Sequence, residues 1–398
     1  MAKPLTGIRV LDLGRFIACP FCGMLLADLG AEVIRVERSI GGDDRYYELL
    51  TPSGDTYHFT NINRNKKGIS LNFERNPRAR EILDELVRHS DVLIENFSSG
   101  AAKAIGITYD ELKKVKPDII FAHVSGFGST GPYANRIGFD MIAKAMAGAM
   151  AISGFPGIPV REQVPWVDFG TGSLTAIGIL AALLERKDTG KGKEIGTSLL
   201  QTAVSYMAPV ISEWETGKAD RQQIGNRRYW TGPCDLYQAK DGKWVYIALL
   251  GNSIWRRFAK FIGGDELANN PKFHTDPARF EHRDILDNIV KDWVATHSAE
   301  EIMTLAEKIP VPAGICLDHT EVASHPQVKE QNMLTEVLTP DGKSRIVVGN
   351  IPFKMSSDEP LKVERSFPAI GQHNEEIYTD LLGYNQTDLD RFKEEGVL

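Results

Sequence analysis

Residues 7–37, GIRVLDLGRFIACPFCGMLLADLGAEVIRVE, contain the pattern of a strand, a helix and a second strand. The runs GIRVLDLG (7–14) and EVIRVE (32–37) are apolar enough to lie between two layers of helices, which is typical of a parallel sheet. Further strands and helices alternate in the same way, at 68–73, 77–89, 91–97, 109–114 and 118–128. The first third of the chain is therefore predicted to be a doubly wound α/β domain.

The helix of the opening unit is expected around 22–29, and Cys19-Pro-Phe-Cys22 at its start has a spacing found in redox and zinc sites. A zinc site needs a second close pair of ligands, but Cys234 and Cys316 are far apart and no His pair has metal-binding spacing. The position after a strand suits a thioredoxin-like redox pair, whereas the rest of such a unit does not follow. We expect instead that Cys22 packs in the core and that Cys19 lies in the strand-to-helix turn.

Beyond residue 211 the composition of the chain changes. Residues 212–230 are polar and charged and are predicted to be a linker. A hairpin turned by KDGK follows within 234–250, and SAEE at 298–301 is a capping box that starts a helix, so 231–325 is predicted to be a small α+β domain. A second hairpin at 334–348 and closing helices end the chain.

The composition limits the class of protein. The 398 residues carry 46 Lys and Arg against 53 Asp and Glu, a net charge of -7 without long blocks of one sign, which gives no support for nucleic-acid or membrane-surface binding. The N-terminus lacks the apolar segment of a signal peptide, and the most apolar run, LTAIGILAALLE (174–185), is too short to cross a bilayer. We expect a soluble, cytoplasmic, enzyme-sized protein.

The second strand ends in an acidic residue, Glu37, as in a dinucleotide-binding domain, and Arg38 follows it directly. The first turn lacks the glycine pattern that lets a pyrophosphate approach the backbone. An arginine at this edge suits a phosphate on a nucleotide ribose, but a solvated surface arginine fits the pattern equally well.

Asp168 precedes the segment 170–173, Gly-Thr-Gly-Ser, which is predicted to start a long helix. One interpretation is an ordinary helix N-cap. The other is a partly enclosed carboxylate that acts as a nucleophile, because no Ser or Cys nucleophile motif is present. The residues alone leave both interpretations open.

Several long segments resemble one family, the class III CoA-transferases, which includes formyl-CoA transferase and crotonobetainyl-CoA:carnitine CoA-transferase. The resemblance runs over nearly the whole chain and is carried by residues 7–38, 63–72, 91–97, 125–140, 168–192 and 371–384. It implies a Rossmann-like large CoA-binding domain, with 1–211 as its first part, and a return of 326–398 to that domain through a linker. It also implies an interlocked dimer of ring-like subunits, as a homodimer or as a heteromer with a paralogous subunit.

By the same resemblance, Asp168 is the catalytic nucleophile, which forms a mixed anhydride and then an aspartyl-CoA thioester. A CoA thioester is then a substrate, and no metal or permanently bound cofactor is required. The residues expected to contact CoA are Ile17, Ala18, Arg38, Leu71, Asn72, Asn96, Phe97 and Arg136.

Two departures from the family bear on the substrate. Ile17 stands where formyl-CoA transferases have a Gln that handles small acids, so we expect an acceptor acid larger than formate, with succinyl-CoA as a candidate donor. The related α-methylacyl-CoA racemases need a His in a Gly-His-Asp triplet as a second base, and Phe139 occupies that place here. A racemase, or a subunit of a hetero-oligomeric CoA-transferase, remains the alternative.

Overall fold

The computed structural model describes residues 3–356 and 361–398. The chain divides into two compact units. The large unit comprises Met1–Ala147, Gln163–Ala208 and Pro326–Leu398, and the small unit comprises Gly148–Glu162 and Pro209–His325. The C-terminal residues thus belong to the large unit, and the short segment Gly148–Glu162 belongs to the small one, which the sequence pattern did not suggest.

The large unit is built on a six-stranded parallel sheet with the strand order β3-β2-β1-β4-β5-β6. Its strands are β1 (Arg9–Asp12), β2 (Glu32–Glu37), β3 (Lys67–Ser70), β4 (Val92–Glu95), β5 (Ile120–Ser125) and β6 (Lys193–Ser198). This order places the topological switch point between β1 and β4, where open α/β sheets bind their ligands. The α/β prediction is confirmed, but β6 was missed because its sequence, KEIGTS, is too polar to signal a strand.

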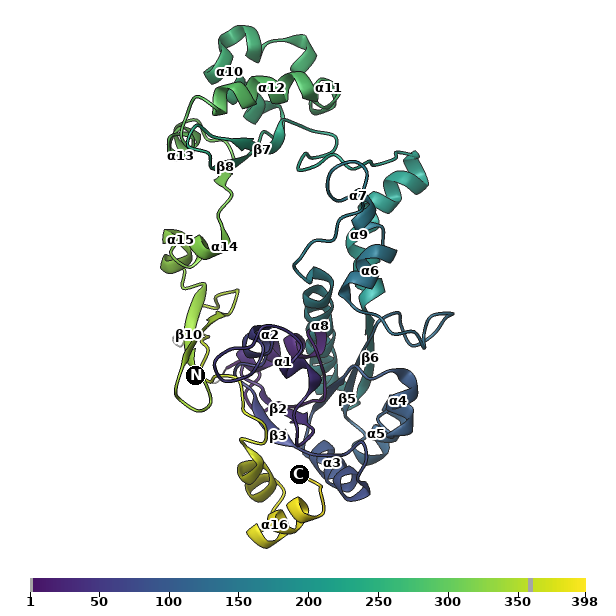
Figure 1. Cartoon of the computed structure of the whole chain (residues 1–398). Helices are drawn as coiled ribbons and strands as arrows, with labels where there is room; N and C mark the ends of the chain where they lie inside the picture. The colour runs from purple at the N-terminus through teal and green to yellow at the C-terminus, as the bar shows by residue number, and fades with distance from the viewer. Residues whose placement is uncertain (1–2, 357–360) are drawn as a thin grey trace. The chain divides into compact units, whose positions relative to one another are not determined.

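Neighbouring residues on each strand enter two different cores. Val10 faces one core and Leu11 the other, as alternation along a strand requires. Both faces of the sheet are therefore covered by helices (Figure 1). One face carries α1 (Ala18–Asp28), α6 (Asp140–Met146), α8 (Trp166–Thr189) and α9 (Leu199–Gly217), and the other carries α3 (Pro77–Arg88), α4 (Ser99–Ala104), α5 (Tyr109–Val115), η3 (Glu376–Leu381) and α16 (Gln386–Glu394).

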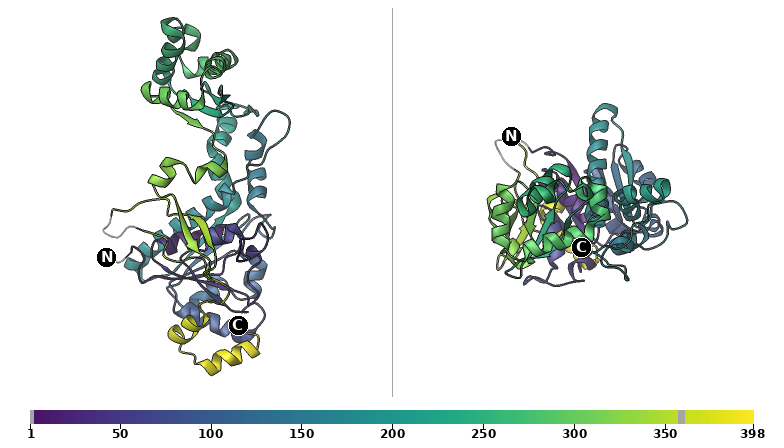
Figure 2. Two further views of the ribbon diagram at one scale, coloured as in Figure 1. Left: turned by 60° about the vertical axis from the view of Figure 1, so that its left-hand side comes forward. Right: turned by 90° about the horizontal axis from the view of Figure 1, so that it is seen from above.

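The C-terminal segment closes the second core. The N–H of Asn72 donates to the Val397 carbonyl at 2.8 Å, and the Tyr384 hydroxyl donates to Glu85 on α3 at 2.6 Å. Figures 1 and 2 show the end of the chain beside α3 in both views. The remaining elements of the large unit are η1 (Asp43–Arg45), α2 (Tyr57–Ile62), α15 (Pro326–Glu330) and the hairpin of β10 (Leu334–Leu338) and β11 (Arg345–Gly349).

The small unit contains the predicted hairpin, extended to three antiparallel strands in the order β7-β8-β9. Its helices bury Trp255, Phe258 and Val290 against this sheet. Its elements are α7 (Ala149–Ile152), β7 (Cys234–Gln238), β8 (Trp244–Ala248), α10 (Asn252–Ala268), η2 (Pro271–Phe273), α11 (Asp276–Glu281), α12 (Arg283–Val294), α13 (Ala299–Lys308), β9 (Ala313–Ile315) and α14 (His319–Val322). The capping box at Ser298 and Glu301 is present as expected.

Three local expectations differ from the structure. Helix α9 continues to Gly217, into the segment predicted to be a linker. Cys19 lies inside the first turn of α1 and is as fully buried as Cys22, rather than in the turn before the helix. The Ala- and Gly-rich sequence of 139–154 predicts one helix, but the structure has two, which are separated at Gly148, whose φ of +84° lies in the left-handed region that favours glycine.

Helix α8 is longer than the apolar run suggested. It has 24 residues, and by length and composition alone it could cross a bilayer, so the expectation from the shorter run was wrong on this point. Half of its most apolar window is buried inside this chain. A core helix of a folded domain passes the same test, so this helix is weak evidence for membrane insertion.

Candidate active site

Asp168 lies in the first turn of α8, which begins two residues earlier at Trp166. The helix approaches the start of α1 so closely that a Cβ at Gly172 would lie 2.5 Å from the Ala18 carbonyl oxygen. A Cβ at Gly170 would lie 2.7 Å from the Tyr206 ring. The glycines after Asp168 therefore let α8 pack against its neighbours, and this packing brings the carboxylate to the turn between β1 and α1.

The N-cap function belongs to another residue. Asp140, at the start of α6, accepts the backbone N–H groups of Val167 at 2.9 Å and Asp168 at 3.3 Å on its Oδ2. Its Oδ1 lies 2.9 Å from the Lys144 ammonium, which is fully buried. Asp168 is thus not the N-cap, and its own carboxylate is not committed to capping α8.

The environment of Asp168 raises its pKa to about 7. Burial makes the largest contribution, because it disfavours the charged form, and the Asp140 carboxylate raises the pKa further. The Lys144 cation acts in the opposite direction. Perturbed carboxylates of this kind cluster at functional sites.

A cavity of about 190 Å³ lies over Asp168. Five of the residues expected to contact CoA line it together with Asp168: Ile17, Ala18, Asn96, Phe97 and Arg136. Arg15, Phe16, Gly126 and Phe139 also contribute to the lining. The carboxyl ends of β1, β4 and β5 therefore converge on Asp168.

Aromatic side chains form one wall of this cavity. Phe16 packs edge-to-face against Phe139, with ring centroids 5.5 Å apart, and against Tyr47 at 5.9 Å. Phe16 has a φ of 63°, an uncommon conformation for a bulky residue that is found where a turn is held in place by its surroundings. The negative charge of Asp168 is among the influences that raise the pKa of Tyr47, after burial, Glu48 and Asp44.

The turn after β4 holds the turn after β1. Asn96 accepts the N–H of Arg15 at 2.9 Å through Oδ1 and donates to the Arg15 carbonyl at 2.8 Å through Nδ2. Glu95 accepts the N–H of Phe97 at 2.6 Å and is paired with His123 on β5. Burial lowers the pKa of His123, but Glu95 outweighs it and the net shift is upward. The Asn96 side chain thus has a structural function besides any contact with a ligand.

Two further cavities lie near the Asp168 cavity and share lining residues with it or with each other. The first, of about 10 Å³, shares Arg15 and Phe97 with it, and it shares Arg38 and Glu74 with the second, of about 350 Å³. Asn72 lines the second cavity. The three cavities follow the carboxyl edge of the sheet, as an elongated nucleotide-bearing substrate would require.

Arg38 and Leu71 occupy different environments. The Arg38 guanidinium lies 2.7 Å from Asp43 in a partly exposed ion pair, and its Nε has no hydrogen-bond partner in the described part of the chain. Leu71 is fully buried and donates its N–H to the Glu37 carbonyl at 2.7 Å. Leu71 therefore has no side chain at a cavity and no spare N–H for a ligand.

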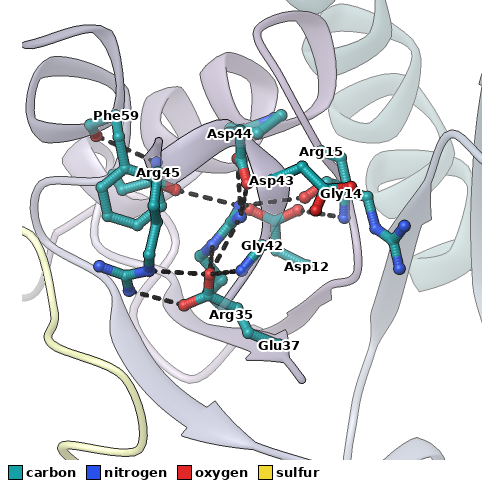
Figure 3. A network of polar contacts seen from close by, with 12 residues as sticks. Asp12, Gly14, Arg15, Arg35, Glu37, Gly42, Asp43, Asp44, Arg45 and Phe59 are labelled. Carbon is teal, nitrogen blue, oxygen red and sulfur yellow. Dashed lines mark hydrogen bonds and ion pairs between the residues drawn. The ribbon is translucent and has the colours of Figure 1, made fainter. Parts of the chain in front are cut away.

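The other two arginines near Arg38 are structural (Figure 3). Arg35 contacts Asp44 at 2.7 Å and donates to the Gly14 carbonyl at 3.0 Å, while Arg45 contacts Glu37 at 2.6 Å. All of these side chains are almost completely buried. Burial would raise the pKa of Glu37, but Arg35 and Arg45 outweigh it and hold it at about 2. Of the three arginines, Arg38 is the one that lines the cavity of about 350 Å³.

The turn between β1 and α1 is anchored from below by Lys66. Its ammonium, fully buried, contacts Asp12 at 2.7 Å, the Pro20 carbonyl at 2.8 Å and Asn63 at 2.8 Å. Asp12 also accepts the Gly14 N–H at 2.9 Å, a contact visible in Figure 3. The ion pair therefore holds both ends of the turn that carries the cavity-lining residues 15–18.

Cys19 and Cys22 lie above this ion pair and are not oxidised to a disulfide. Burial raises the pKa of both thiols, and the nearby Asp12 carboxylate adds to the effect. A reactive thiol needs the opposite environment, exposed and electropositive. The surroundings of Cys19 and Cys22 therefore favour a structural function for this Cys-x-x-Cys rather than a redox or zinc site.

Sequence reasoning missed Asp140, Lys144, Arg15 and Tyr47. Asp140 and Lys144 could have been recognised from the sequence, because an Asp and a Lys four residues apart on a predicted helix form an ion pair on one face. Arg15 and Tyr47 could not have been recognised in this way, since only the packed turns bring them to the cavity and its wall. Among the described residues, no group of three or more His, Cys, Asp or Glu side chains is arranged to hold a metal ion.

A parallel α/β sheet with cavities at its carboxyl edge, and a carboxylate with a raised pKa at one of them, indicates an enzyme that binds its substrate at this edge. The chain belongs to CoA-transferase family III, whose family model matches residues 5–374. It is accordingly a CoA-transferase that moves CoA between an acyl-CoA and a carboxylic acid, with CoA thioesters as substrates.

Curated relatives match over almost their whole length. A succinyl-CoA–D-citramalate CoA-transferase of Chloroflexus aurantiacus is 36% identical, over 97% of this chain and 96% of its own. The beta subunit of a succinyl-CoA–L-malate CoA-transferase from the same organism is 32% identical over 99% and 98%. A formyl-CoA:oxalate CoA-transferase of Streptomyces avermitilis is also 32% identical, over the whole of both chains. The crystal structure of a CaiB/BaiF family protein from Brucella suis superposes with a TM-score of 0.84 at 30% identity, covering 96% of this chain and all of the other.

Proposed function

We propose that Asp168 is the nucleophile of the transfer. Its carboxylate attacks the donor thioester carbonyl and expels CoA thiolate, which leaves an acyl-aspartyl anhydride. The thiolate then attacks the aspartyl carbonyl, releases the donor acid and leaves an aspartyl-CoA thioester. The acceptor carboxylate attacks this thioester and expels CoA thiolate, which leaves an anhydride between the acceptor and Asp168. The thiolate then attacks the acceptor carbonyl of this anhydride, which gives the new acyl-CoA and regenerates the Asp168 carboxylate.

The observation that carries this proposal is the position of Asp168, half-buried at the end of three linked cavities, with its own carboxylate free of the capping contact that Asp140 provides. The N–H groups of residues 170–173 lie beyond the first turn of α8 and serve its internal hydrogen bonds, so they are not expected to be oxyanion donors. Oxyanion donors are therefore expected from the turn at Phe16–Ala18.

A trapping experiment tests the nucleophile. The enzyme is incubated with an acyl-CoA donor without an acceptor, treated with hydroxylamine, digested and analysed by peptide mass spectrometry. We expect a hydroxamate on Asp168, because hydroxylamine cleaves anhydrides and thioesters. An unmodified Asp168, in an enzyme whose Asp168→Asn variant still turns over, would exclude the mechanism.

We further propose succinyl-CoA as the donor and an acid larger than formate as the acceptor. The names of two relatives combine succinyl-CoA with hydroxylated dicarboxylic acids, and Ile17 and the Phe16–Phe139 wall offer a small acid no polar partner. The test is kcat/KM with succinyl-CoA against citramalate, malate, glutarate, oxalate and formate. A preference for formate or oxalate would overturn this assignment.

The rate is expected to depend on pH through Asp168. Since only the ionised carboxylate is nucleophilic and its pKa is raised to about 7, kcat/KM should be constant above this value and fall about tenfold per pH unit below it. The measurement is a pH profile of kcat/KM with one acyl-CoA, checked for enzyme stability at each pH. A profile that stays flat down to pH 5 would show that Asp168 titrates as an ordinary carboxylate.

Arg38 is proposed to bind the 3′-phosphate of CoA. Replacing it with Gln should raise KM for the acyl-CoA about tenfold, because one charge-assisted hydrogen-bonding partner is lost. With 3′-dephospho-CoA thioesters the same substitution should have little effect. Arg78→Gln, which removes an exposed arginine paired with Glu81, is the matched control. Equal effects of Arg38→Gln on both substrates would show that Arg38 does not contact this phosphate.

The assembly and the location remain proposals as well. We propose an interlocked homodimer that acts in the cytoplasm, with a heteromer as the alternative because one relative is named as a beta subunit. Activity of the chain purified alone, with a mass by light scattering of twice the 44.1 kDa chain, would support the homodimer. A racemase has less support, since the residues that line the Asp168 cavity include no second carboxylate and no His.

A further inference from the structure

Lys144 is a buried cation next to the proposed nucleophile, and no step of the transfer uses it. It lies on α6, one helical turn after Asp140, with no exposed surface. Its ammonium contacts Asp140 Oδ1 at 2.9 Å and donates to the Val164 carbonyl at 2.5 Å. The Trp166 ring centroid lies 5.3 Å away. An isolated buried ammonium is costly, so such a residue needs a function or a compensating partner.

The contacts of Lys144 with the Val164 carbonyl and with Asp140 lead to the start of α8. Val164 belongs to the segment that enters the helix, and Asp140 caps the helix by accepting the N–H groups of Val167 and Asp168. Lys144 therefore joins α6 to the backbone that carries the nucleophile. Because the capping contact is strongest when Asp140 is ionised, a cation beside Asp140 also preserves the cap.

The same pair faces the carboxylate of Asp168. Two carboxylates near each other resist ionising together and compete for one proton. The charge of Lys144 is opposite to that of Asp140 and offsets part of the effect of Asp140 on Asp168. The Asp140 carboxylate disfavours the ionised form of Asp168, whereas the Lys144 ammonium favours it.

Other charged or titratable groups around Asp168 come from different elements. Arg15, from the turn after β1, is paired with Glu74, and Arg136, from the loop before α6, stacks on Tyr133 at 3.8 Å. Tyr47, from the segment after η1, has a raised pKa and stays neutral. Of the cations here, Lys144 is the one that contacts the capping carboxylate itself.

We propose that Lys144 is a positioning residue that keeps Asp168 ionised, and therefore nucleophilic, at neutral pH by compensating the charge of Asp140. This inference rests on the nucleophilic function proposed for Asp168. In the covalent intermediates Asp168 is an uncharged acyl group, so the effect of Lys144 is confined to the free enzyme and to the attack on the donor.

The experiment compares pH profiles of kcat/KM for Lys144→Gln, Lys144→Arg and Asp140→Asn. Lys144→Gln should move the acidic midpoint to higher pH by about one unit or more, because Asp140 and Asp168 then share a proton. Lys144→Arg, which keeps the positive charge, should have a midpoint close to that of the wild type. Asp140→Asn should move the midpoint to lower pH, since an Asn oxygen still accepts the N–H groups of α8 while the negative charge is gone.

The matched control is Lys67→Gln. Lys67 is also a poorly exposed, ion-paired lysine, but its partners are Glu32 and Glu376 and it lines a different cavity. Its substitution should leave the midpoint unchanged. If Lys144→Gln does not fold, the downward shift in Asp140→Asn decides the question.

An unchanged or lowered midpoint in Lys144→Gln, or an unchanged or raised one in Asp140→Asn, overturns the inference. The two proposals fail in different ways. If Asp168→Asn keeps its activity, the nucleophile itself is wrongly assigned. If that variant is inactive while the Lys144 and Asp140 variants keep the wild-type profile, only the function of Lys144 is wrong.

Discussion

The Asp168→Asn variant is expected to lose transferase activity by a factor on the order of 10⁴ or more, because a nucleophile that forms the covalent intermediates has no substitute in the site. The amide has nearly the shape of the carboxylate, so CoA binding should be retained. The measurement is kcat for succinyl-CoA with an acid acceptor, together with Kd for CoA by calorimetry. Asp188→Asn, at the exposed end of α8, is the control and should be fully active.

The same variant should not be less stable than the wild type. The folded-state pKa of Asp168 is raised, so ionisation of this group opposes folding above that pKa, and the cost disappears as pH falls below the unfolded value of about 4. Asp168→Asn removes this cost, so its Tm advantage should grow as pH rises from about 4 to about 7 and stay constant above 7. An inactive variant with a lower Tm at pH 8 would point to damaged folding instead of lost chemistry.

The Lys66→Met variant is expected to be the most destabilised of the single variants considered, by about 3–5 kcal/mol, because it leaves the Asp12 carboxylate buried without its cation. The fully buried pair is separated by 2.7 Å, and Lys66 also holds the Pro20 carbonyl. Thermal unfolding and the CoA affinity of the folded fraction are the measurements. Both should decrease, since the turn that lines the cavity loses its anchor.

Two comparisons make the Lys66 result interpretable. The double variant Asp12→Leu/Lys66→Met should recover part of the stability, because the unpaired charge is gone. Lys67→Met, at the neighbouring residue that begins β3, should cost much less, since its partners Glu32 and Glu376 remain accessible to water. If Lys66→Met has the Tm of the wild type, the buried pair does not hold the turn.

The strands and the family segments were readable from the sequence because they depend on local patterns. The apolar runs predicted β1, β2 and the other central strands, whereas β6 lies at the edge of the sheet and carries too few apolar residues to be recognised. The predicted boundary between the large domain and the linker, at residue 211, was inexact for a similar reason. Polar residues dominate the end of α9, so the sequence there resembles a linker although the helix continues to Gly217.

The sequence also revealed only part of the candidate active site. Asp168 stood out by itself, but whether it caps α8 could not be decided, because the residue that does so, Asp140, is remote in sequence and belongs to another helix. Arg35, Arg38 and Arg45 looked alike. Their different functions depend on which of them the fold buries against Glu37 and Asp44 and which it leaves at a cavity.

By itself the sequence determined the alternation of strands and helices, the resemblance to a CoA-transferase family and the carboxylate to examine, since periodicity and motif spacing are local properties of the chain. The tertiary structure decided the environment of that carboxylate. Burial, the Asp140 cap and the Lys144 cation act over a few ångströms between segments remote in sequence, and only packing brings them together. The same holds for the turn at 15–18, whose position depends on a buried ion pair between Asp12 and Lys66.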